Sequence, residues 1–161
     1  MTNKNEGTSA QMFTTSLQSP WGWVALAGSD AGLRDLHLAD TRKRVLSLLE
    51  AAPVSHTASR VSAGAPVFSG YSALDIVERL SAGQDIGDLT LDFRGTVFQT
   101  KIWQALRTIP LGSTLSYQQF ANRLVMPTAT RAVASACGKN RLALLVPCHR
   151  IVRADGEIGR A

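Results

Sequence analysis

The chain has 161 residues, of which 45% are hydrophobic and 18% are charged, and its formal net charge is +5. This composition is typical of a globular protein, and the length suffices for one domain with a core or for two small lobes. With only 2 Cys and 3 His, a disulfide-rich scaffold is excluded, and their spacing gives no metal-binding pattern. No segment approaches the roughly 20 apolar residues that span a bilayer, and the polar start lacks a signal peptide, so we expect a cytoplasmic protein with no membrane partner.

Basic residues are concentrated in the later part of the chain. Residues 1–95 carry 8 Lys or Arg and 10 Asp or Glu, whereas residues 96–161 carry 9 Lys or Arg and 2 Asp or Glu. Because Lys and Arg supply most of the sequence-independent affinity for nucleic acid, this bias favours a polyanionic partner. A solvated basic face without a partner fits the charge equally well.

The first lobe is predicted over residues 13–94, after a disordered tail at residues 1–12. Within residues 13–38, β-favouring residues alternate with turn signals, which predicts an antiparallel meander. Further on, the spacing of apolar residues predicts one helix at 41–51 and another at 68–82, with a polar loop at 52–64 between them. A strand is predicted at 89–93.

The second lobe, residues 95–161, is predicted to be mainly helical. Two capping-box pairs mark helix starts, Thr96 with Gln99 and Ser116 with Gln119. The predicted helices cover residues 96–109, 116–124 and 127–138. Pro127 stands at the first position of the last helix, where proline is tolerated. Two short helices joined by a tight turn predict a helix-turn-helix.

Between Ala129 and Ala136 nearly every side chain is small, and Arg131 is the one long cation. Small side chains let a helix approach a partner closely, and a single arginine among them suits the narrow minor groove of DNA. A helix packed in a protein core is equally rich in alanine. A helix-turn-helix transcription factor would instead carry several long polar side chains for the major groove, and they are mostly missing here.

An apolar run at residues 142–146, predicted as a strand, ends at Pro147 and is followed by Cys148, His149 and Arg150. Nearby positive charge and hydrogen bonding favour the ionised form of a thiol. Cys148 is therefore the candidate nucleophile. From these residues alone a buried structural cysteine fits equally well, because free cysteine is among the most buried residue types.

Several short segments of the second lobe share a pattern with a known family. They are Phe93-Arg94-Gly95-Thr96, Phe98-Gln99, Ser116-Tyr117-Gln118-Gln119, Arg131-Ala132-Val133, Asn140 and Val146-Pro147-Cys148-His149-Arg150. Together they closely resemble the O6-alkylguanine-DNA alkyltransferases, strongly over residues 88–158 and weakly before them. The resemblance implies an α+β fold, with a small ribonuclease-H-like N-terminal lobe followed by a helix-turn-helix alkyltransferase lobe.

The resemblance also implies the reaction. A member of this family transfers an alkyl group from O6-alkylguanine in double-stranded DNA to its own cysteine, here Cys148, once per molecule and without a cofactor. His149 would receive the thiol proton through a bridging water. Asn140 would brace the turn before the active-site strand, Arg150 would be a structural partner, and Cys137 would serve packing.

DNA contacts follow from the same resemblance. The damaged nucleotide must leave the duplex before a side chain can reach it. Arg131 would fill the gap that it leaves, and Tyr117 would help to rotate its phosphate. The remaining DNA-binding positions are expected on the same helix, at Ala129, Thr130, Ala132 and Ser135. The protein is expected to act as a monomer.

Relatives continue with a tyrosine-containing loop over the guanine pocket and a final helix whose glutamate orients the histidine. Residues 156–161 offer no counterpart to either. If the sequence is complete as given, we expect an impaired or poorly stable alkyltransferase, because an unoriented imidazole is a weaker base. The alternative is a non-transferring alkyltransferase-like protein that binds DNA damage, although such proteins usually lack the cysteine.

Overall fold

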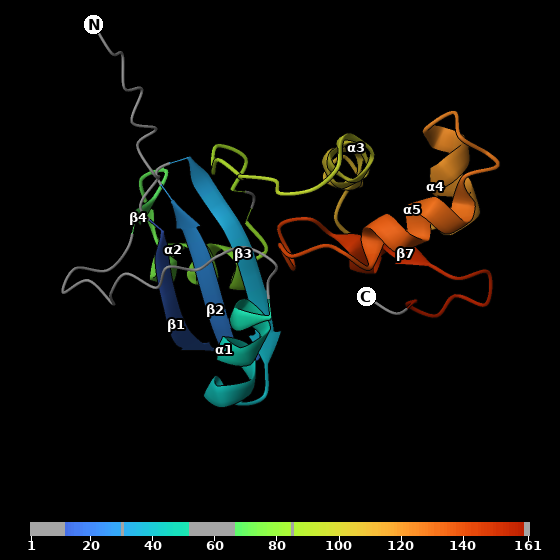
Figure 1. Ribbon diagram of the computed structural model, residues 1–161. Coiled ribbons are helices and arrows are strands. Elements are labelled where there is room, and N and C mark those ends of the chain that lie inside the picture. The colour runs from blue at the N-terminus through green and yellow to red at the C-terminus, as the bar shows by residue number, and fades with distance from the viewer. Residues whose placement is uncertain (1–11, 30, 52–66, 85, 160–161) are drawn as a thin grey trace, which may run out of the picture. The chain divides into compact units, whose positions relative to one another are not determined.

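A computed structural model describes residues 12–29, 31–51, 67–84 and 86–159 of the chain (Figure 1). Residues 1–11 of the predicted tail and the predicted loop at 52–64 lie outside these ranges. The chain forms two compact units, Met1–Arg34 with Ala39–Asp92 and Asp35–Leu38 with Phe93–Ala161. Both contain helices and strands, so the fold is mixed. No helix in the described ranges is long and apolar enough to cross a membrane.

A three-stranded sheet opens the chain. Its strands are β1 (Phe13–Ser19), β2 (Gly22–Ser29) and β3 (Gly32–Ala39), which lie in that order. β1 runs antiparallel to β2, with Phe13 opposite Gly28 and Ser19 opposite Gly22. The predicted strands at residues 13–38 are thereby confirmed.

Helix α1 (Arg42–Glu50) confirms the first predicted helix. Thr41 caps it, because its side chain accepts a hydrogen bond from the backbone N–H of Arg44. Two buried residues of the helix pack against two alanines of β2 in one apolar cluster, formed by Ala25, Ala27, Val45 and Leu49. Because the side chains of a strand alternate between faces, both alanines lie on the same face of the sheet.

The second predicted helix, at residues 68–82, is shorter than expected. Helix α2 (Ala73–Ser81) begins at a capping box, and two short strands precede it, β4 (Val67–Phe68) and β5 (Tyr71–Ser72). Ser69 and Gly70 between the strands have φ angles of 50° and 88°. A right-handed helix excludes such angles, so the prediction was wrong for residues 68–72.

The predicted strand at 89–93 is reduced to one isolated bridge, in which Leu91 pairs in parallel with Leu33. Leu89 instead belongs to a turn, since its N–H donates to the carbonyl of Ile86 at 3.1 Å. Asp92 follows the bridge and forms an ion pair with Arg34 at 3.1 Å.

Three helices build most of the second unit, α3 (Val97–Leu106), α4 (Tyr117–Arg123) and α5 (Thr130–Cys137). Both predicted capping boxes are present at the starts of α3 and α4. Helix α3 packs against α5, where the indole N–H of Trp103 donates to the carbonyl of Ala136 at 2.9 Å. Gly95 lies against the same indole, and a Cβ there would come within 2.6 Å of it.

Helix α5 begins later than predicted. Pro127 lies in the turn before the helix, and Ala129 is the N-cap residue, without a side-chain cap. The carbonyl of Pro127 is instead bound by the side chain of Gln118 at 3.0 Å. The tertiary contact to α4 thus places the proline before the helix rather than at its first position.

The apolar run at 142–146 is not a strand. Only Leu142 pairs, through an isolated bridge to Leu36, and Leu144 has a φ of 68°. Leu142 and Val146 are buried and the three residues between them are half-buried, although the run forms turns rather than a strand. A short 3-10 turn, η1 (Cys148–Arg150), follows, and then β7 (Ile151–Val152), which pairs in parallel with β6 (Leu115–Ser116).

Candidate active site

Cys148 lies at the end of a tight turn. Pro147 has a φ of −78° and a ψ of 64°, and the N–H of Cys148 donates to the carbonyl of Val146 at 2.8 Å. These values define an inverse γ-turn centred on the proline. Val146 and Pro147 are buried whereas Cys148 is half-buried. The turn therefore fixes the backbone of the cysteine and leaves its thiol partly accessible.

The Asn140 amide connects this turn to the thiol. Its Nδ2 donates to the carbonyl of Val146 at 2.8 Å and to Sγ of Cys148 at 3.3 Å. Its Oδ1 accepts from the backbone N–H of Leu142 at 2.9 Å. The amide of Asn140 therefore joins the backbone of the turn and of Leu142 to the sulfur of Cys148.

His149 follows the thiol and is exposed. Burial of part of its ring, and then the charge of Arg150, lower the pKa of His149. The imidazole is therefore neutral near pH 7 and able to accept a proton. Among the described residues no direct hydrogen bond joins it to Cys148.

Arg150 is anchored to the backbone. Its Nη1 donates to the carbonyl of Ile109, just beyond α3, and its own N–H donates to the carbonyl of Pro147 at 3.0 Å. The guanidinium thus holds η1 against the segment after α3.

Tyr117 and Cys137 lie in the electrostatic neighbourhood of Cys148. Cys137 is buried, and burial followed by the nearby Cys148 raises its pKa to about 12. Burial, then Cys137 and Cys148, raise the pKa of Tyr117. The backbone of Gly159 also approaches this tyrosine, since a Cβ at 159 would lie 2.6 Å from its hydroxyl. Cys148 therefore contributes to the electrostatic environment of Tyr117, the first residue of α4.

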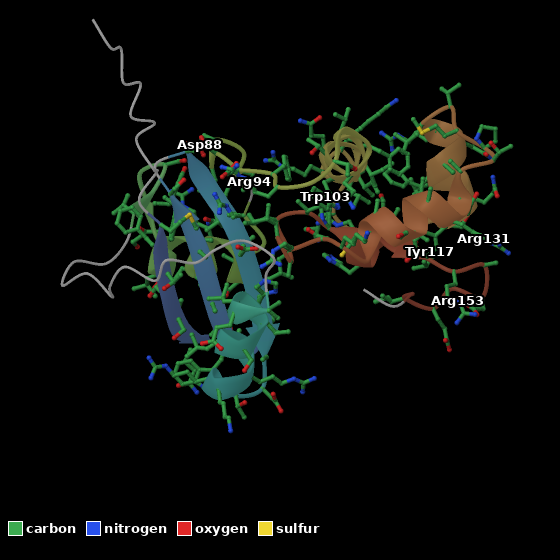
Figure 2. The ribbon with its side chains drawn as sticks, in the orientation of Figure 1. Asp88, Arg94, Trp103, Tyr117, Arg131 and Arg153 are labelled. Atoms are coloured by element: carbon green, nitrogen blue, oxygen red, sulfur yellow. The ribbon has the colours of Figure 1, made fainter. Side chains whose placement is uncertain are left out.

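The outer face of α5 carries the predicted DNA-binding residues. Figure 2 shows Arg131 on this helix, where the residue is exposed together with Ala132 and Ser135. Ala129 and Thr130 are half-buried. The opposite face is buried, through Val133, Ala136 and Cys137. Within the described part of the chain no hydrogen bond or ion pair engages Arg131, so its guanidinium is available to a partner.

One polar network at the start of α5 was not predicted. Gln118 of α4 accepts a hydrogen bond from the hydroxyl of Thr130 at 2.9 Å and donates to Asn122 and to the carbonyl of Pro127, both at 3.0 Å. The i, i+4 spacing of Gln118 and Asn122 was the signal that could have indicated part of it. The network fixes the turn that leads to Arg131. In the described ranges, no three His, Cys, Asp or Glu side chains are grouped as metal ligands would be.

Comparisons with known proteins identify relatives of this chain. Residues 97–161 match the family described as 6-O-methylguanine DNA methyltransferase, DNA binding domain. The chain is 63% identical over 70 residues to the Escherichia coli bifunctional transcriptional activator/DNA repair enzyme Ada. Those 70 residues are 44% of this chain and only 20% of Ada. It thus spans about a fifth of the length of that relative.

Two other relatives are matched over about four fifths of their own length. The methylated-DNA–protein-cysteine methyltransferase of Mycolicibacterium paratuberculosis is 37% identical over 145 residues, which are 89% of this chain and 79% of the relative. The crystal structure of Mycobacterium tuberculosis OGT in complex with DNA superposes with a TM-score of 0.65 at 34% identity, over 90% of this chain and 81% of that one. With this identity over most of both chains, the protein belongs to the O6-methylguanine-DNA methyltransferase family.

Proposed function

We propose that this protein repairs DNA by moving an alkyl group from O6 of guanine onto Cys148. The observation that carries the proposal is the Asn140 amide directed at the half-buried sulfur of Cys148, at 3.3 Å. The relatives named methylated-DNA–protein-cysteine methyltransferase support the same reaction. They also disfavour a protein that binds damage without transfer.

The proposed chemistry is a single displacement. The thiol proton passes to His149 through a water, and the Cys148 thiolate attacks the alkyl carbon. The Sγ–C bond forms as the C–O6 bond breaks, and the leaving guanine takes up a proton. The thioether that results has no good leaving group, so each molecule reacts once. The reaction needs no redox partner and no activated cofactor.

We propose that α4 and α5 form a helix-turn-helix that contacts the DNA. The first unit would be the ribonuclease-H-like lobe. The outer face of α5 would enter the minor groove, because its small residues permit close approach. The net charge of residues 96–161 and the DNA complex of the mycobacterial relative support a DNA partner. The monomeric state and the cytoplasmic location remain predictions.

Nucleotide flipping is proposed as the way in which the lesion reaches the sulfur. Arg131 would occupy the space in the duplex, and Tyr117 would contact the phosphate of the displaced nucleotide. The exposure of Arg131 and the electrostatic effect of Cys148 on Tyr117 support these roles. Replacing Arg131 with alanine (Arg131→Ala) should therefore slow the reaction with duplex substrate more than the reaction with single-stranded substrate, each rate being compared with that of the parent.

A single-turnover assay tests the function. The protein is mixed with duplex that contains one O6-methylguanine, and the peptide that contains Cys148 is analysed by mass spectrometry. We expect one methyl group on Cys148 and loss of the lesion, with neither product for unmodified duplex. Tight binding to the lesion without a mass gain would contradict transfer and favour the damage-binding alternative.

A further inference from the structure

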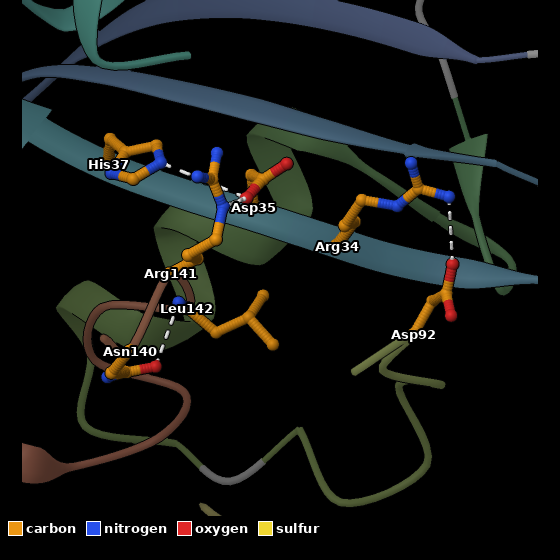
Figure 3. Close-up of polar contacts among 7 residues, drawn as sticks. All are labelled: Arg34, Asp35, His37, Asp92, Asn140, Arg141 and Leu142. Carbon is orange, nitrogen blue, oxygen red and sulfur yellow. Dashed lines mark hydrogen bonds and ion pairs between the residues drawn. The ribbon is translucent and has the colours of Figure 1, made fainter. Parts of the chain in front are cut away.

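A buried ion pair lies on the strand that adjoins the active-site segment. Asp35 of β3 is 0% exposed, and its Oδ1 accepts a hydrogen bond from Nε of Arg141 (Figure 3). His37 of the same strand has its Nε2 3.9 Å from that oxygen. Burial lowers the pKa of His37 despite the opposing effect of Asp35. His37 is therefore neutral near pH 7, and Arg141 is the cation that neutralises Asp35.

Arg141 stands next to the residue that holds the thiol. Its own carbonyl accepts from the N–H of Leu36 at 2.8 Å, and the N–H of Ala143 donates to the carbonyl of Leu36 at 3.1 Å. The side chain and the backbone of residue 141 are thus both fixed to β3. Asn140, one position earlier, is the residue that donates to Cys148. An unbroken set of contacts therefore runs from Asp35 to the sulfur.

Stability alone is a poor explanation for this pair. Removing a carboxylate and a guanidinium from water costs free energy that their attraction often fails to offset, so apolar replacements are frequently neutral or stabilising. What a buried pair of fixed geometry supplies is a defined position. Residue 140 must be placed closely, since catalytic groups lose effect when displaced by about 1 Å.

The geometry points to Asp35 and Arg141 as positioning residues for Cys148: the ion pair holds segment 140–143 on β3 so that the Asn140 amide meets the sulfur. This inference rests on the proposed alkyl transfer. Neither residue touches DNA or the alkyl group in this scheme. Their effect reaches the reaction through Asn140.

The test separates position from stability by replacing both charges. Arg141→Met alone would leave the Asp35 carboxylate buried without its partner and could unfold the protein. The Asp35→Leu, Arg141→Met double variant removes both charges and should stay folded. A matched control replaces the neighbouring pair with Arg34→Met and Asp92→Leu. Those two side chains are also mostly buried, at 7% and 14% exposure, but they belong to the first unit.

Two rates are measured for the parent and both double variants. One is the maximal single-turnover rate of methyl transfer at saturating duplex, with the half-saturating DNA concentration. The other is alkylation of Cys148 by iodoacetamide, followed by mass spectrometry. For the Asp35, Arg141 variant we expect both rates to fall about tenfold or more, with an unchanged half-saturating concentration and unchanged thermal stability. The control should keep parental rates.

Parental rates in the folded Asp35, Arg141 variant would overturn the inference, as would an equal loss of rate in the control. If iodoacetamide alkylates Cys148 of the parent but the parent never accepts methyl from DNA, the proposed function is refuted. In that case the iodoacetamide rates would still decide the positioning role. The two failures are therefore distinguishable.

Discussion

The two cysteines of the chain are eleven positions apart and have opposite environments. Cys137 is 2% exposed at the end of α5, where burial holds its thiol protonated. Cys148 is half-buried after an inverse γ-turn and receives the amide of Asn140. Under the proposed function, the local backbone and one amide, rather than the residue type, would distinguish the reactive thiol from the packing one.

The strongest test of this contrast replaces each cysteine in turn with alanine. Cys148→Ala should abolish transfer, because the acceptor atom is gone. Cys137→Ala should keep the parental rate and lose about 1 kcal/mol of stability through the small cavity. Single-turnover assays and urea denaturation of both variants measure these effects. Comparable loss of transfer in the two would show that Cys137 belongs to the reaction.

A second test removes the amide that marks the reactive site. Asn140→Ala loses three hydrogen bonds, two of them to backbone groups. We expect transfer and iodoacetamide modification of Cys148 to slow about tenfold to a hundredfold, with about 1–3 kcal/mol of destabilisation. If iodoacetamide reacts with the variant as fast as with the parent, the amide does not activate the sulfur.

A third test uses pH to report on the unreactive thiol. The pKa of Cys137 in the folded protein, about 12, exceeds its unfolded value of about 8.5. Its contribution to stability is full below about pH 8.5 and is lost as the pH rises towards about 12, since the unfolded state releases the proton first. Denaturation from neutral to alkaline pH should therefore show a steeper fall for the parent than for Cys137→Ala. Parallel pH profiles would disagree with a buried, protonated Cys137.

The smallest expected effect concerns the turn before the helix of Cys137. Val125 is 87% exposed and has a φ of 59°, which strains a β-branched residue. Val125→Gly should therefore raise the free energy of unfolding by about 1 kcal/mol. The transfer rate at Cys148 should stay parental. A loss of stability on thermal denaturation would show that the valine side chain makes contacts that outweigh the strain.

Local signals were sufficient at three helix starts but not at α2, whose capping box at Ser72 lies after the predicted start at residue 68. Thr96 and Ser116 each accept the expected backbone N–H, and the helix predicted from residue 41 is capped by Thr41, so those starts were predictable from a few neighbouring residues. The run at 142–146 was not, because apolar residues are equally well buried in turns. Leu144 with its positive φ belongs to a conformation that no residue-type pattern indicates.

The candidate site was predictable only in part. Cys148 and Asn140 were expected to work near one another, and the structure brings them within hydrogen-bond distance. The pairing of Asp35 with Arg141 joins residues 106 positions apart, and neither has a neighbour in sequence that indicates the other. Such long-range contacts arise from the packing of β3 against segment 140–143, which local spacing does not encode.

The tryptophans are distributed in a way that supplies an optical probe. Trp21 and Trp23 belong to the first unit, whereas Trp103 in the second is buried and bonded to the helix that carries Cys137. With both earlier tryptophans changed to phenylalanine, intrinsic fluorescence would come from Trp103 alone. Its emission wavelength would then report on the packing of α3 against α5 in real time after damaged duplex is added.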